Sequence, residues 1–537
     1  MLFLGTSKSQ SVFSKWHLYR AIIIVSVFAA AATNFSATNF YAPLLAATTS
    51  SYDATSKKKK PHIVMVVMDD LGSHDLGLHG TGIKTPHSDK LAQDGMYLDN
   101  YYVTPYCSPT RASLMSGKYP IHTGIYNVIS DYSAAGLPVE EETLADLLKK
   151  GGYETRAVGK WHLGFAKWEF TPTYRGFDSF YGFYKGGQDY FTHKSHKAYD
   201  LRFDSQPNCG DGCSQIIDER GNYSTHVYTR EAIHVIQNYN VSSYESDDGK
   251  PLFLYLAFQA VHGPNEVPPE YMEVYDDKNW TEQRKIYAGM LTAADEGIGN
   301  VTQALKDNGL WDDTLFIFTT DNGGPTVACA VQGSSNYPKR GGKCSVWEGG
   351  TTGDAFMSGP VLERLGIRQQ SKFPHLFHVV DWLPTLAELV GVATRQDIDG
   401  KSQLRGLRYD MAVREHVLVG YAYGQKYGTK GWYGPAIRYG RWKLIQGKSG
   451  GPDQYDIKPR GSRKPLPAGV NDSSYVLYDL ETDIGEVNNV ASLHPDVVEF
   501  LRQKLKEYHE EVVPPQPDED PSCPWTGTVK TTVGPTW

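Results

Sequence analysis

Four oxygen-bearing side chains stand directly after two strongly apolar segments of the chain. Asp69 and Asp70 follow one apolar run, and Asp321 and Asn322 follow another. Carboxylate and amide oxygens are the ligands that Ca²⁺ and Mg²⁺ prefer. Taken alone, an Asp-Asp pair after a strand is more often a turn or a helix cap. Because carboxylates held together repel each other, the four residues together predict a site for one calcium or magnesium ion.

Four further side chains have the chemistry to hold an anion or to move a proton: Lys160, His162, His262 and Lys343. Lys160 and His162 are two residues apart, so in an extended segment both would project toward one pocket. His262 comes shortly after an apolar run, and Lys343 lies in a glycine-rich segment. Each of them, taken alone, is more often a surface lysine or a packed histidine.

The segment Cys107-Ser108-Pro109-Thr110-Arg111 is the most specific pattern in the chain. By chance, Cys-x-Pro-x-Arg should occur in roughly one chain of this length in fifty. The alternative is a buried or disulfide-bonded cysteine beside a helix that starts with Ser-Pro. The pattern therefore needs a compatible site around it.

The spacing of apolar residues predicts the strands and helices that position these side chains. Runs typical of strands buried on both faces of a sheet occur at 62–68, 252–258 and 314–320. Helical periodicity between and after them predicts helices at 143–150, 287–305 and 376–390. Strands alternating with helices indicate an α/β fold, in which sites form at the carboxyl ends of strands. Short strand-like pieces and a helix at 496–508 predict that a large domain, 61–415, is followed by a small α+β domain, 416–537.

These motifs, taken in their order along the chain, resemble those of the type I sulfatases, and they most resemble those of the arylsulfatase B group. The matching segments are Asp-Asp-Leu-Gly, Cys-x-Pro-x-Arg, Gly-Lys-Trp-His-Leu-Gly, Val-His-x-Pro, Asp-Asn-Gly-Gly and Lys-x-x-x-Trp-Glu-Gly-Gly. The similarity is strong over residues 61–400 and patchier beyond. It implies an alkaline-phosphatase-like fold, with a large mixed sheet between layers of helices and a smaller C-terminal α+β domain.

The resemblance also implies a role for each candidate residue. Cys107 would be oxidised by the formylglycine-generating enzyme to formylglycine, whose hydrated form attacks the sulfur of a sulfate ester. The implied calcium ligands, with the modified Cys107, are Asp69, Asp70, Asp321 and Asn322. By the same resemblance, the diol would be held by Arg111 and His162. The sulfate oxygens would be bound by Lys160 and Lys343. The leaving alcohol would be contacted by His262.

Two rival functions remain open from the sequence. Sulfate and phosphate esters share shape and in-line geometry, so a phosphate or phosphonate ester hydrolase of the same superfamily is one alternative. A secreted carbohydrate-binding protein that keeps the scaffold without catalysis is the other. The loop at 129–138 lacks cysteines that animal arylsulfatase B proteins carry there, so the resemblance implies sulfated carbohydrates in general rather than one sugar.

Composition and the N-terminus indicate a secretory enzyme. The 537-residue chain carries a formal net charge of −8, so nucleic acid is not an expected partner. Residues 1–32 combine basic residues with a short apolar run, which predicts a signal peptide rather than a signal anchor, and no stable membrane insertion. Residues 33–60 read as an unstructured linker. The expected compartment is lysosomal or extracellular.

Modification signals agree with that route. Six N-glycosylation sequons begin at Asn34, Asn222, Asn240, Asn279, Asn300 and Asn471. There are six cysteines, and if Cys107 is modified an odd number remains. The pairs expected from short glycine-rich spacings are Cys209 with Cys213 and Cys329 with Cys344, which leaves Cys523 over.

Overall fold

The structure is a computed structural model that describes residues 59–518, apart from seven gaps. The gaps are 196, 246–248, 327–332, 422–433, 451–453, 457–462 and 466–474. The predicted signal peptide, nearly all of the predicted linker, and Cys329 and Cys523 lie outside the described residues. Residues 60–537 form one compact unit, and the division at residue 415 stays a prediction.

A mixed sheet of ten strands forms the centre of the large domain, in the order β12-β2-β11-β10-β1-β9-β3-β4-β7-β8. Its strands are β1 His62–Met68, β2 Met96–Tyr102, β3 Glu154–Lys160, β4 Ser179–Phe183, β7 Arg202–Asp204, β8 Ser214–Ile216, β9 Leu252–Ala257, β10 Thr314–Thr320, β11 Ala355–Ser358 and β12 Ser371–His378. The three predicted strands are confirmed as β1, β9 and β10. They are neighbours, with β1 parallel to both β9 and β10. Their carboxyl ends therefore meet at one edge of the sheet.

Helices cover both faces of this sheet because β1 is apolar on both of its sides. Ile63, Met65 and Val67 pack into one core cluster with α3, α5 and α12, whereas the alternate residues pack with α2, α6 and α9 on the other face. The α-helices are α2 Pro86–Asp94, α3 Cys107–Ser116, α4 Pro120–Thr123, α5 Leu144–Lys150, α6 Ser224–Gln237, α7 Val241–Glu245, α8 Pro269–Glu273, α9 Glu282–Asp307, α10 Glu348–Thr351, α11 Val361–Leu365, α12 Trp382–Val390, α13 Leu404–Tyr409 and α14 Pro495–Glu510. This layered arrangement confirms the expected α/β fold.

The predicted helix at 376–390 starts too early, because α12 begins only at Trp382. Residues up to His378 complete β12, which pairs with β2, and a short 3-10 turn at Val379–Asp381 precedes α12. The carboxylate of Asp381 accepts the backbone N–H of His378 at 2.9 Å, which turns the chain out of the strand. A short apolar run buried on all sides does not by itself distinguish a strand from a helix.

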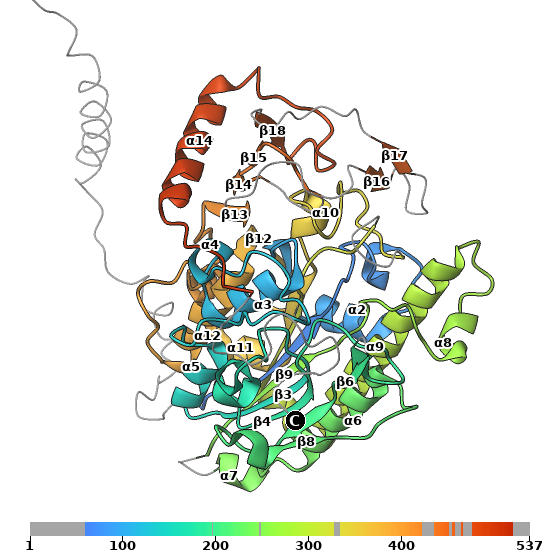
Figure 1. Ribbon diagram of the computed structural model, residues 1–537. Helices are drawn as coiled ribbons and strands as arrows, with labels where there is room; N and C mark the ends of the chain where they lie inside the picture. Colours follow the sequence, from blue (N-terminus) through green and yellow to red (C-terminus); the bar gives the residue numbers. More distant parts are fainter. Residues whose placement is uncertain are drawn as a thin grey trace, which may run out of the picture. The chain divides into compact units, whose positions relative to one another are not determined.

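A four-stranded antiparallel sheet and a helix make up the C-terminal part, as predicted. The strands, in spatial order, are β13 His416–Gly420, β14 Ala436–Tyr439, β15 Trp442–Gln446 and β18 Tyr475–Asp479. Figure 1 shows α14 beside this sheet, and Leu501 and Leu505 of α14 pack against Ile437 and Leu444. The remaining strands form two small hairpins, β5 Lys194–Ser195 with β6 Ala198–Tyr199, and β16 Gln454–Asp456 with β17 Arg463–Pro465.

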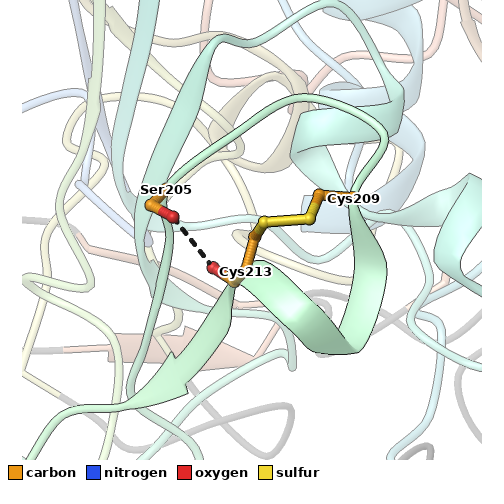
Figure 2. Close-up of a disulfide and its surroundings, with 3 residues drawn as sticks. All are labelled: Ser205, Cys209 and Cys213. Carbon is orange, nitrogen blue, oxygen red and sulfur yellow. Dashed lines mark hydrogen bonds between the residues drawn. A yellow bond between two sulfur atoms is a disulfide. The ribbon is translucent and has the colours of Figure 1, made fainter.

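One of the two predicted disulfides is present among the described residues. Cys209 and Cys213 are bonded across a short helical turn, and Ser205 Oγ donates to the Cys213 carbonyl at 3.3 Å (Figure 2). Cys344 is also disulfide-bonded. Cys107 is a free, buried thiol. Within the described ranges, the structure contains no helix that combines the length and the apolar character needed to cross a bilayer.

Candidate active site

The predicted metal ligands lie side by side at the carboxyl ends of β1 and β10. Met68 and Thr320 are paired in the sheet, so the residues that follow them are brought together. The Asp70 backbone N–H donates to Asp321 Oδ1 at 3.2 Å, and Asn322 Nδ2 donates to Asp70 Oδ1 at 2.7 Å. Asp69, Asp70, Asp321 and Asn322 are all completely buried. Three carboxylates thus share one dry site.

Helix α3 presents Cys107 and Arg111 to these carboxylates. Cys107 is the first residue of this fully buried ten-residue helix, at its partially positive end. Its sulfur and one carboxylate oxygen each of Asp69 and Asp321 all lie within 4.8 Å of one another. Arg111, one turn further on, donates through Nε and Nη2 to Asp321 Oδ2 at 3.1 and 2.9 Å. The helix therefore holds the nucleophile candidate and a cation against the same carboxylate.

Two buried lysines complete the positive side of the site. Lys160, the last residue of β3, donates to Asp69 Oδ2 at 2.5 Å. Lys343 lies 2.6 and 2.8 Å from the two carboxylate oxygens of Asp70. Both lysine side chains are at most 5% exposed. Positive charge is thus brought close to Cys107 in a protein whose net charge is negative.

The electrostatics of the carboxylates are unequal. Burial, reinforced by the neighbouring Asp321, raises the pKa of Asp69 to about 8. Burial would also raise the pKa of Asp70, but Lys343, His262 and the hydrogen bond from Asn322 together outweigh it and lower that pKa to about 2. Burial likewise raises the pKa of the Cys107 thiol. Asp69 is therefore the carboxylate that most needs a further positive charge in order to ionise.

The donor set fits a hard divalent cation. Asp69 Oδ1 and Asn322 Oδ1 are buried and have no hydrogen-bond partner among the described residues. A buried oxygen without a partner is costly, and a cation among these oxygens would satisfy both and relieve the repulsion. Oxygen donors of this kind suit calcium or magnesium.

Lys160 and His162 both lie in the site, but the extended segment that the prediction assumed does not continue to His162. His162 has a φ of 61°, so the segment turns sharply instead of continuing as an extended strand. Its Nε2 lies 3.1 Å from the carbonyl oxygen of Ile129, and its buried Nδ1 has no partner among the described residues. Burial, together with the charge of Lys160, lowers the pKa of His162 well below its usual value.

His262 lies beside Asp70. Its Nδ1 donates to the Gly263 carbonyl at 2.7 Å, which leaves Nε2 as the free nitrogen, 3.8 Å from Asp70 Oδ2. Burial and the nearby Lys343 lower the pKa of His262 to about 3. The structure thus brings all of the predicted site residues together, and His262 alone of the two histidines directs a ring nitrogen at Asp70.

Sequence reasoning missed a glycine pair that packs against both histidines. A Cβ added to Gly186 would lie 2.7 Å from His162 Nε2, and one added to Gly187 would lie 3.2 Å from the ring of His262. The Gly-Gly pair just after β4 was the available signal, because glycine in such a position often marks a close approach. These two residues set how near the chain after β4 comes to the histidines.

Comparison with known proteins agrees with the geometry. Residues 61–392 match the sulfatase family. The chain is 35% identical over 504 residues to arylsulfatase J of Mus musculus, covering 87% of this chain and 79% of that protein. It is 30% identical over 471 residues to arylsulfatase A of Homo sapiens, covering 83% and 87%. These matches support the type I sulfatases as a group and do not single out arylsulfatase B.

Solved structures share the fold. The crystal structure described as Ps i-CgsB in complex with k-i-k-neocarrahexaose is similar, with a TM-score of 0.70 at 28% identity over 86% of this chain and 95% of that chain. The expectation of an alkaline-phosphatase-like large sheet with a smaller C-terminal antiparallel sheet is confirmed by such neighbours.

Proposed function

The chain belongs to the sulfatase family and is a sulfuric ester hydrolase, and on that premise we propose that it hydrolyses sulfated carbohydrates with a formylglycine made from Cys107. The observation that carries this proposal is the buried, unpaired Cys107 at the start of α3, facing two carboxylates and surrounded by cations. A hydrated formylglycine would supply two hydroxyls on one carbon, one to accept the sulfuryl group and one to release it.

The residues around Cys107 have separate tasks in this proposal. Arg111 and His162 hold the nucleophile, because the Arg111 guanidinium is fixed on Asp321 and His162 is fixed on the Ile129 carbonyl. Lys160 and Lys343 hold the sulfate oxygens, where negative charge develops as the S–O bond breaks. Fixed donors in a dry site need no reorganisation at that moment, which is the physical basis of the rate enhancement.

The proposed metal is one calcium ion, with magnesium as the alternative. Asp69, Asp70, Asp321 and Asn322, with the modified Cys107, would hold it. When bound, the ion supplies positive charge that polarises the sulfate and favours ionisation of the nucleophile. Support comes from the two unpartnered buried oxygens and from the raised pKa of Asp69.

His262 is proposed to act on the leaving alcohol. Its Nδ1 is committed to the Gly263 carbonyl, so Nε2 is the nitrogen available to the bridging oxygen, and the ring must first take up a proton at Nε2 before it can donate one there. A sugar alkoxide is strongly basic and must be neutralised as it departs, whereas a phenolate needs little help. The role of His262 is therefore tied to the class of leaving group.

Maturation in the secretory pathway is part of the proposal. It is supported by the predicted signal peptide at 1–32, the six sequons and the Cys209–Cys213 disulfide, a bond typical of oxidising compartments. The formylglycine-generating enzyme would act on Cys107 there. Lysosomal or extracellular residence of the mature enzyme follows from the same route.

The first test is chemical and catalytic together. In protein secreted from eukaryotic cells, mass spectrometry of the peptide containing Cys107 should find formylglycine, and the protein should release sulfate from 4-nitrocatechol sulfate. Cys107→Ser should lose nearly all turnover, because a serine has only one hydroxyl on its β-carbon. Full activity with an unmodified thiol contradicts the mechanism, and faster turnover of an aryl phosphate than of the aryl sulfate would favour the phosphate-ester alternative.

A further inference from the structure

A polar group beside the catalytic histidines is not used by the chemistry described above. It consists of Lys185, just after β4, Asp131, in the loop that departs from arylsulfatase B, and Ser195 in β5. The Ser195 hydroxyl donates to Asp131 Oδ2, and Lys185 Nζ lies 3.7 Å from the same oxygen. Three segments distant in sequence therefore meet at one carboxylate.

This group adjoins the catalytic centre through two direct connections. The carbonyl of Ile129, two residues before Asp131, is 3.1 Å from His162 Nε2, and its N–H donates to Ser108 Oγ at 3.0 Å, next to Cys107. On the other side, Gly186 follows Lys185 and packs against the ring of His162. Lys185 and Asp131 are thus each tied to the site by a neighbour in the chain.

The ammonium of Lys185 lacks the partners that a nearly buried charge normally has. Its side chain is 6% exposed. Among the residues that the structure describes, Nζ has no hydrogen bond, since the Asp131 oxygen at 3.7 Å is too far and the Phe165 ring lies 5.6 Å away. An ammonium has three donors, so the donors that Nζ does not use within the protein are available to a ligand.

We propose that Lys185 and Asp131 form a sugar subsite in which Lys185 donates to, and Asp131 accepts from, hydroxyls of the substrate ring next to the sulfate. The inference rests on the proposed function and names the part of the substrate that sets specificity. An adjacent donor and acceptor of opposite charge match a pair of neighbouring ring hydroxyls, each of which can donate and accept.

The charges at the subsite favour hydroxyls over a second anion. Lys185 lies against the Asp131 carboxylate, and its backbone N–H donates at 3.1 Å to the Asp200 carboxylate, which the charge of Arg202 also offsets. A second sulfate or a carboxylate would meet no net positive charge there. The subsite therefore suits a neutral, hydroxylated sugar ring.

The test compares two substrates that share the sulfate and differ in the leaving group. Lys185→Met and Asp131→Asn are assayed on 4-nitrocatechol sulfate and on N-acetylgalactosamine 4-sulfate and 6-sulfate. A lost hydrogen bond to a charged group should lower kcat/KM on the sugar sulfates by about 10- to 100-fold. The aryl sulfate, which has no ring hydroxyls to place there, should change less than about threefold.

Lys118→Met is the matched control. The Lys118 side chain is 7% exposed and is paired with Glu141 at 2.9 Å, but it follows the far end of α3, about 15 Å of helix from Cys107. This variant should lower stability without changing the ratio of the two activities. This control therefore distinguishes the general effect of removing a buried lysine from a specific loss of sugar binding at the subsite.

Each outcome decides the inference separately from the proposed function. Equal losses on both substrates, or no loss on either, overturn the subsite while wild-type sulfate release still upholds the sulfatase. N-acetylgalactosamine 4,6-disulfate is assayed beside the two monosulfated sugars, and a larger loss on it assigns Lys185 to a second anion and contradicts the hydroxyl assignment. A wild type that releases sulfate from the aryl ester but from neither sugar also contradicts it. If Lys185→Met does not fold, Asp131→Asn, which keeps the side-chain shape, decides alone.

Discussion

At the scale of single residues, the site depends on charges that are each held by one specific partner. Lys343 holds Asp70, Lys160 holds Asp69 and Arg111 holds Asp321. Pairing each carboxylate with its own cation keeps the donors in fixed directions before substrate arrives. Such preorganisation is what allows the same groups to stabilise a transition state.

His262→Ala provides a prediction at this scale. Loss of the group that faces the leaving alcohol should slow hydrolysis of a sugar sulfate by at least about 100-fold more than hydrolysis of 4-nitrocatechol sulfate, because only the sugar leaves as a strongly basic alkoxide. The measurement is the ratio of kcat/KM for the two substrates in wild type and variant. Arg111→Ala is the control, since it should damage both reactions alike. Equal losses for His262→Ala would instead assign this histidine to holding the sulfate.

At the scale of elements, a buried ionic cluster joins the small sheet to the large domain. Lys443 of β15 lies 2.9 Å from Glu348 of α10 and 2.8 Å from Glu486, and all three side chains are at most 1% exposed. Tyr102 of β2 donates to Glu348 at 2.7 Å. One ammonium thus serves two carboxylates. Burial, offset only in part by Lys443, raises the pKa of Glu486 to about 7.

This cluster predicts how stability depends on pH. Below about pH 4.5 Glu486 is protonated in both states and its contribution is fully present. Between about 4.5 and 7 the unfolded chain releases the proton and the folded protein keeps it, so stability falls as pH rises, and above 7 the loss is complete. The loss is on the order of 3 kcal/mol. Relative to wild type, Glu486→Gln should therefore gain stability across this window, measured by urea unfolding at several pH values.

Glu481→Gln is the control for the pH experiment. Glu481 belongs to the same part of the chain, but its side chain is 65% exposed and pairs with Arg441 on the surface. The variant should unfold with the wild-type dependence on pH, since an exposed pair contributes little. If Glu486→Gln and wild type stay parallel from pH 4.5 to 7, Glu486 is already ionised in the folded protein.

At the scale of the whole molecule, one cation should stabilise the entire compact unit. The proposed ligands follow β1 and β10 in the centre of the sheet, and their mutual repulsion opposes folding when no ion is present. Removing bound metal with EGTA or EDTA should therefore lower Tm and abolish sulfate release, and added calcium should restore both. Thermal unfolding and metal analysis measure the effect. Asp321→Asn should bind less calcium and show a smaller rise in Tm.

Two outcomes bear on the identity of the metal. If magnesium restores Tm and sulfate release as well as calcium does, the site accepts either ion. Recovery of activity only with zinc, at two ions per chain, would contradict the single-ion assignment and favour the phosphate-ester alternative. An Asp321→Asn protein with wild-type metal content would remove Asp321 from the ligand set.

The sequence by itself determined the central strands, the order of motifs and the candidate residues that the fold brings together. Continuous apolar runs predicted β1, β9 and β10, because a strand buried on both faces has no polar side to display. Polar residues directly after such runs predicted a shared site, since parallel strands end at one edge. The Cys107 to Arg111 pattern was specific without being decisive, and it indicated a chemistry only together with the other motifs.

Only the tertiary structure decided the directions and the partners of these side chains. Lys343 and Asp70 are separated by 273 residues, and no local pattern shows that their charges meet. The turn at His162 depends on a positive φ that surrounding contacts impose, and the segment before α12 became a strand because β2 was there to pair with it. The Lys185 subsite likewise exists only where three distant segments converge on Asp131. The local sequence determines the spacing of apolar residues along strands and helices, whereas contacts between distant segments determine where the side chains point and which partners they meet.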